Sequence, residues 1–121
     1  MRDKVFLVIV KTGVRGSQDL EESLREMKEL AESAGGIVAG SAKANAQHPS
    51  PSHFIRGGKI EELTLMIAET GANVLIFNVD LSPVQARNLE DACGVRVVDR
   101  TGLILDIFAR RAVSSDGKLQ V

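Results

Sequence analysis

Apolar positions along this chain fall into two kinds of segment, short continuous runs and longer stretches with helical spacing. The runs at residues 5–10 and 74–77 are continuously apolar and β-branched, which is typical of strands buried on both faces of a sheet. Two further runs, at residues 37–42 and 95–98, predict two more strands. The run at 37–42 is less apolar, so we expect that strand nearer an edge of the sheet.

Each predicted strand is followed by a segment with helical spacing. The predicted helices span about residues 18–34, 58–71, 83–93 and 101–112. The third has the clearest start, because Ser82, Pro83 and Gln85 have the order of a capping box. Between the second strand and the second helix lies a long loop with Pro49 and Pro51, and long loops in compact domains are often functional.

Strands alternate with helices four times, which predicts an α/β fold built on a small open sheet of four parallel strands. The first and third strands are the most apolar and should be central, so we expect the strand order 2-1-3-4 with helices on both faces. That order places a topological switch point between the first and third strands. Ligands of such sheets bind at the carboxyl ends of the strands beside the switch point.

Composition limits the classes of protein to consider. A chain of 121 residues with 44% hydrophobic residues fits one domain with a real core. The 15 Lys and Arg nearly balance the 16 Asp and Glu, so any binding to a polyanion must come from a local patch. Cys93 is the only cysteine and is predicted to lie in the core. No apolar run reaches the ~18 residues of a membrane span, so we expect a cytoplasmic protein that does not contact membranes.

One candidate patch lies between residues 33 and 60, a stretch without an acidic residue. Its basic and titratable side chains are Lys43, His48, His53, Arg56 and Lys59. Gly57 and Gly58 precede a predicted helix, where paired glycines allow an RNA phosphate to approach the backbone closely. The alternative is that Gly57 only forms a turn and Gly58 only caps the helix. The two histidines lack a nearby carboxylate or thiol, so we expect no metal site.

A second candidate is a nucleotide crevice at the predicted switch point. Thr12, Gly13 and Arg15 follow the first strand, and Asn78 and Asp80 follow the third. A glycine-bearing turn before a helix can present N–H groups to a phosphate. Neither a phosphate-loop spacing nor a dinucleotide glycine pattern is present, so a plain turn is the alternative.

The remaining polar pair is Asp99 and Arg100, which follow the fourth strand. We interpret them as a structural turn, either an ion pair or a helix cap. The sequence shows neither a nucleophile with a base nor a pair of poised carboxylates. We therefore predict no catalytic residues and no enzymatic activity for this chain alone.

Four segments in a specific order and spacing carry a family resemblance. They are residues 54–63, 81–90, 95–112 and 117–121. Together they resemble the N-terminal domain of the HflX family of ribosome-associated GTPases, over essentially the whole chain. The resemblance implies an N-terminal α/β domain over residues 1–113 and the start of a helical linker at 114–121. Phe54 departs from the family, where a tyrosine is usual, and so does Arg56, where a small residue is usual.

The resemblance also implies which cofactors and partners to expect. The family's GTPase elements have no counterpart here, so GTP and Mg would belong to the GTPase domain, and this chain should bind no cofactor of its own. The implied role is to dock on the large ribosomal subunit, on its rRNA, and to position the GTPase domain for ribosome dissociation or rescue. This hypothesis predicts that Lys43, Arg56 and Lys59 converge on one face.

Two other hypotheses remain open. The crevice could make this an independent domain that binds ATP or GTP. Alternatively, the chain could be an intramolecular scaffold whose fourth helix is covered by its own linker and GTPase domain or by a second copy, giving a homodimer. In that case four apolar side chains face the sheet and two point elsewhere. Those facing the sheet are Leu103, Ile104, Ile107 and Phe108, and those pointing elsewhere are Leu105 and Val113.

Overall fold

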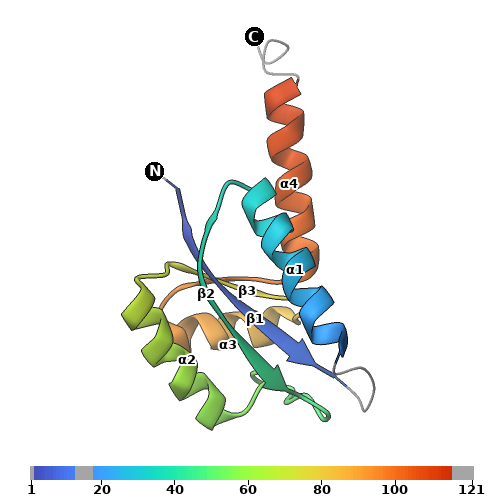
Figure 1. The fold of residues 1–121 in the computed structure, drawn as a ribbon. Helices are drawn as coiled ribbons and strands as arrows, with labels where there is room; N and C mark the ends of the chain where they lie inside the picture. Colours follow the sequence, from blue (N-terminus) through green and yellow to red (C-terminus); the bar gives the residue numbers. More distant parts are fainter. Residues whose placement is uncertain (1, 13–17, 116–121) are drawn as a thin grey trace.

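A computed structural model describes residues 2–12 and 18–115. The described chain forms one four-stranded sheet in the order β2-β1-β3-β4, and every neighbouring pair is parallel (Figure 1). The strands are β1 (Lys4–Lys11), β2 (Ile37–Asn45), β3 (Val74–Phe77) and β4 (Arg96–Val98). The helices are α1 (Gln18–Ser33), α2 (Gly57–Thr70), α3 (Pro83–Cys93) and α4 (Arg100–Ser115). The predicted fold class and strand order are confirmed.

Helices cover both faces of the sheet. The side chains of β1 alternate between the two apolar cores that lie beneath these helices. Phe6, Val8 and Val10 pack with residues of α2 and α3. Val5, Leu7 and Ile9 pack with residues of α1 and α4. All six are at most 4% exposed, as expected for a central strand of a parallel sheet.

The helix ends follow the local sequence. At the start of α3, Ser82 Oγ accepts a hydrogen bond from the Gln85 N–H (3.1 Å) and Gln85 Oε1 accepts one from the Ser82 N–H (2.8 Å), which confirms the predicted capping box. Gly71 and Gly94 follow α2 and α3 with φ of 74° and 73°, a left-handed conformation that glycine adopts without strain.

Strand β2 is longer than predicted, since it reaches Asn45 and pairs with β1 along its whole length. Ala42 and Ala44 pack on the core that contains α2 and α3. Because side chains alternate along a strand, Lys43 points to the opposite face, where α1 lies. The sequence placed Lys43 in a loop, where no such direction is set.

Helix α4 begins on the sheet and continues beyond it (Figure 1). Leu103 and Ile107 are buried against the sheet, as predicted, and Ile104 is partly buried. Leu105 is 62% exposed, which also matches the prediction. Phe108 is 60% exposed, so its predicted place against the sheet is wrong. Apolar spacing alone does not show where the sheet beneath a helix ends.

Candidate functional site

An open hollow of about 380 Å³ lies at the carboxyl ends of β1 and β2. The described residues that line it are Lys11, Asn45, Ala46, Gln47, His48, Phe54 and Arg56. Three of these are basic or titratable to a cation, and no described residue of the lining carries a carboxylate. Its size is in the range of small-molecule sites, and its charge suits an anion.

The segment after β2 folds back to form one wall of this hollow. The Ala46 N–H donates to the Lys11 carbonyl at 2.9 Å, which continues the pairing with β1 by one residue. Ser50 and Phe54 then form an antiparallel bridge, with N–H to carbonyl hydrogen bonds of 3.1 and 2.9 Å. The predicted long loop is therefore a compact turn in this region.

Helix α3 holds this turn in place. The Gln85 side-chain amide donates to the Ser50 carbonyl at 2.8 Å, and the Asn88 amide donates to the Ser52 carbonyl at 2.9 Å. Within the turn, Ser50 Oγ accepts hydrogen bonds from the N–H groups of Ser52 and His53. These contacts fix the shape of the wall without a ligand.

Phe54 lines the hollow in a backbone conformation that is unusual for its residue type. Its φ is +68°, and it is the only non-glycine residue with positive φ in the described ranges. For a side chain of this kind that conformation costs on the order of 1–3 kcal/mol, and such residues cluster at functional sites. Part of the side chain packs on the core beneath α2 and α3, which holds it there.

Arg56 stands at the N-cap of α2, and its side chain is exposed and makes no capping hydrogen bond. The helix begins at Gly57, so the alternative that Gly58 is the N-cap is wrong. A Cβ added to Gly57 or Gly58 would meet no atom within 4 Å. Packing inside the domain therefore does not require glycine at either position.

The predicted convergence of Lys43, Arg56 and Lys59 on one face is wrong. Lys43 forms an ion pair with Glu21 of α1 at 2.6 Å, and this hydrogen bond and charge lower the pKa of the Glu21 carboxyl. Lys59 pairs with Glu62 within α2 at 2.8 Å, and α1 and α2 lie on opposite faces of the sheet.

The structure instead brings Arg56 together with Lys11 and His48. Sequence reasoning did not group Lys11 with Arg56. Its signal was its place as the residue that ends the first strand, because the ends of parallel strands share one edge of the sheet. His53 lies elsewhere in the turn, with its ring Nδ1 2.9 Å from Ser52 Oγ.

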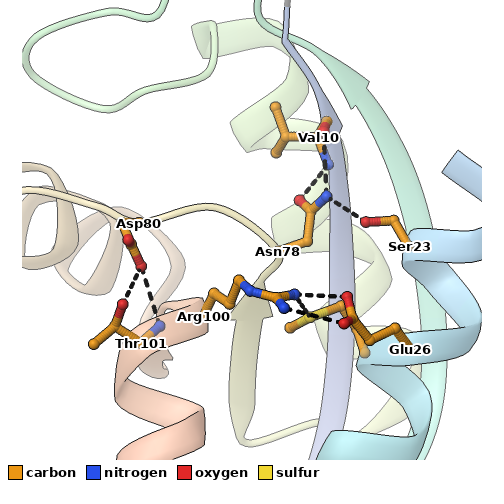
Figure 2. Close-up of polar contacts among 8 residues, drawn as sticks. Val10, Ser23, Glu26, Asn78, Asp80, Arg100 and Thr101 are labelled. Atoms are coloured by element: carbon orange, nitrogen blue, oxygen red, sulfur yellow. Dashed lines mark hydrogen bonds and ion pairs between the residues drawn. The ribbon is translucent and has the colours of Figure 1, made fainter. Parts of the chain in front are cut away.

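Asn78 and Asp80 of the predicted nucleotide crevice are bonded to different parts of the domain. Asn78 Oδ1 accepts from the Val10 N–H at 2.7 Å, and its Nδ2 donates to the Val10 carbonyl at 3.3 Å and to Ser23 Oγ at 3.0 Å (Figure 2). This amide ties the end of β3 to β1 and α1. Thr12 is exposed, and Gly13 and Arg15 lie outside the described residues.

Asp80 is bonded to the start of α4 rather than to this region. Its Oδ1 accepts from the Thr101 N–H at 3.1 Å and from Thr101 Oγ1 at 2.7 Å. These two hydrogen bonds lower the pKa of the Asp80 carboxyl. Figure 2 shows Asn78 and Asp80 turned to separate partners.

Asp99 and Arg100 act separately in the structure. Asp99 caps α4, since its Oδ1 accepts from the Gly102 N–H at 2.8 Å, and its Oδ2 accepts from the Leu81 N–H at 3.1 Å. Arg100 instead forms a bidentate pair with Glu26 of α1, at 2.6 and 3.0 Å (Figure 2). The arginine lowers the pKa of Glu26 and the carboxylate raises that of Arg100.

We call Asn78, Asp80, Asp99 and Arg100, with their partners, the polar junction. The four side chains join the ends of β3 and β4 to β1, α1 and α4. Their hydrogen bonds are made within the domain, so the junction is structural in character.

Other kinds of site find little support in the described part of the chain. No three His, Cys, Asp or Glu side chains there come together as a metal ion would require. Cys93 is buried, which raises the pKa of its thiol. Among the described helices, none is both long and apolar enough to cross a membrane.

Comparisons with known proteins give the family. The family described as GTP-binding GTPase N-terminal matches residues 21–109. GTPase HflX of Caldanaerobacter subterraneus subsp. tengcongensis is 45% identical over 120 residues, which cover 99% of this chain and 28% of that protein. GTPase HflX of Escherichia coli K12 is 46% identical over 118 residues, which cover 94% of this chain and 26% of that protein.

A solved structure, that of SsGBP in complex with GDP, has the same fold. Its TM-score is 0.70 at 25% identity, and the match covers 99% of this chain and 32% of that one. This chain spans about 28% of the length of the HflX protein from Caldanaerobacter. These matches show that the chain belongs to the HflX family of GTPases and corresponds to its N-terminal domain.

Proposed function

We propose that this domain is the N-terminal module of an HflX-like GTP-binding protein and that it docks on the RNA of the large ribosomal subunit. Docking positions the GTPase domain for ribosome dissociation or rescue in the cytoplasm. GTP and Mg bind in that other domain, and this module hydrolyses no GTP itself. The observation that carries the docking proposal is the hollow, where Lys11, His48 and Arg56 meet without a described carboxylate.

The basic residues of the domain differ in how much charge they leave for a partner. Lys43 and Lys59 are each neutralised by a neighbouring glutamate. Among the described residues, neither Lys11 nor Arg56 forms an ion pair. Two such cations on RNA phosphates release counterions, so log affinity should fall with log salt concentration with a slope of about −1.5 to −2.

Binding to purified large ribosomal subunits across a salt series tests the proposal. We expect Arg56→Glu and Lys11→Glu each to weaken binding about tenfold, the equivalent of about 1.4 kcal/mol. Lys43→Glu is the matched control, because it makes the same change of charge on the α1 face and should alter affinity less than twofold. Circular dichroism verifies that each variant is folded.

Two results would contradict the docking proposal. One is the absence of binding at low salt. The other is an equal loss for Lys43→Glu and Arg56→Glu, because binding would then report only the net charge of the domain.

A second candidate function is a scaffold that acts through α4. Leu105 and Phe108 are exposed apolar side chains three positions apart, so they lie on one side of the helix. We propose that the linker and GTPase domain, or a second copy, cover this face. The side chain of Val113, also predicted to point away from the sheet, lies outside the described residues. Light scattering should show self-association that Phe108→Ser reduces, and a strict monomer at high concentration excludes the homodimer.

A further inference from the structure

The hollow contains more chemistry than a contact to RNA phosphate needs. Cations alone suffice for such a contact. Yet the lining also contains the aromatic ring of Phe54 and the side-chain amides of Asn45 and Gln47. Its volume of about 380 Å³ is large enough to receive a group of the size of a nucleotide.

These groups match three features of a nucleotide, which are its phosphate, the face of its base and the edge of its base. A phosphate is bound by lysine and arginine, and Lys11 and Arg56 are both present. A base stacks on an aromatic side chain, and Phe54 is the aromatic residue of the lining. The edge of a base presents donors and acceptors together, which amides match because each both donates and accepts.

The two amides are free to take up such a ligand. Asn45 and Gln47 are exposed, and neither side chain hydrogen-bonds to another residue in the described ranges. The wall that carries Phe54 is fixed by the Ser50–Phe54 bridge and by the hydrogen bonds from α3. A site whose shape exists before binding loses less conformational entropy when the ligand arrives.

We infer that the hollow receives one unpaired nucleotide, turned out of an RNA strand, with its base against Phe54 and its phosphates on Lys11 and Arg56. This inference rests on the proposed docking and specifies which feature of the RNA is recognised. Paired RNA fits less well, because bases stacked and paired in an A-form helix present no free face to Phe54, and its major groove is too deep and narrow for side chains to read.

The test measures binding of this chain to an RNA hairpin that has one unpaired nucleotide. Four versions of the hairpin carry A, C, G or U at that unpaired position, and a fifth carries 2-aminopurine there. The same hairpin without the unpaired nucleotide is the reference. We expect at least one version to bind about tenfold more tightly than the reference, as base stacking on an aromatic residue gives. The fluorescence of 2-aminopurine should rise on binding, because a base turned out of the strand loses the stacking on neighbouring bases that quenches it.

Two variants identify the side chains involved. Phe54→Leu retains an apolar side chain but no ring, so the preference for the unpaired nucleotide should disappear while affinity for the paired hairpin stays within twofold. Gln47→Ala removes an exposed amide and should reduce discrimination among the four bases. Phe108→Leu is the matched control, since it removes an exposed aromatic ring on α4 and should change neither quantity.

The outcomes separate this inference from the proposed function. Salt-sensitive, Arg56-dependent binding to large subunits without any preference for an unpaired nucleotide overturns the inference and leaves the docking proposal standing. No binding to subunits or hairpins overturns both. Equal binding of free adenosine or guanosine monophosphate and of the hairpin overturns the assignment to an RNA strand.

Discussion

The hollow and the polar junction both lie at the carboxyl ends of the strands, yet their polar groups have opposite kinds of partner. In the junction, Asn78, Asp80 and Arg100 are each bonded to another part of the domain. In the hollow, Lys11 and Arg56 face open space and form no ion pair with a described residue. A polar residue at a strand end thus indicates a ligand site only after its partners inside the chain have been counted.

Position in the sheet explains the difference. The junction lies between α1 and α4, and the polar groups of Asn78 and Asp99 are partly buried there, so they must find hydrogen bonds within the protein. The hollow lies at the ends of β1 and β2, and among the described residues no carboxylate pairs with its Lys11 or Arg56. Polar groups are thus bonded inside the domain at the polar junction and remain open to solvent in the hollow.

The largest effect on stability should come from Asn78→Ala. The substitution removes three hydrogen bonds and leaves the polar groups of Val10 partly buried without partners, so the free energy of unfolding should fall by about 2–3 kcal/mol. Chemical denaturation measures this change. Arg56→Ala in the hollow is the matched comparison and should change stability by less than about 0.5 kcal/mol. A similar loss in both variants would remove the distinction between the two regions.

Acidification should weaken the polar junction. Glu26 and Asp80 have pKa values lowered from 4.5 and 3.8 in the folded state, by Arg100 and Thr101 respectively. Their contribution is therefore complete above pH 4.5 and is lost as pH falls through the lower folded values. An exposed pair such as Glu26 with Arg100 contributes up to about 1 kcal/mol.

Thermal melts between about pH 6 and pH 3 show this loss directly. The double variant Glu26→Gln with Asp80→Asn should be less stable at neutral pH and should lose less stability on acidification than the original chain. An unchanged acid dependence in the double variant would place the responsible carboxylates outside the junction.

The smallest expected change in stability is an increase. Gly58→Ala adds a methyl group in open space at the start of α2 and should stabilise the domain by about 0.5 kcal/mol, because alanine loses less backbone entropy in a helix. If RNA approaches the backbone there, the same variant should bind large subunits more weakly. A variant that is more stable and binds equally well would show that Gly58 serves neither packing nor docking.

The sequence was sufficient for most of the fold. The apolar run at residues 5–10 predicted the central strand, and Ser82 with Gln85 predicted the start of α3. These features depend on residues close together in the chain, so local chemistry determines them. The failure at Phe108 has the opposite origin, because its exposure depends on where the sheet ends beneath α4.

The candidate site was less predictable, for the same reason. Whether Lys43 is available to a ligand depends on Glu21, which lies 22 positions away and reaches it only through the packing of α1 on β2. Arg56 was identified from its neighbours in sequence, whereas Lys11 joins it only because the strands are parallel. Sequence reasoning found the basic side chains and misjudged which of them share a surface.

Helix α4 gives the domain a mechanical property. Its 16 residues extend over about 24 Å, and the first half is held by the Asp99 cap, the Arg100–Glu26 pair and the buried Leu103 and Ile107. The other end stands clear of the sheet (Figure 1). The half beyond Ile107 extends about 12 Å, so a tilt of about 10° displaces its tip by about 2 Å. A change in how the first half packs on the polar junction and the sheet is therefore transmitted to the far end of the helix.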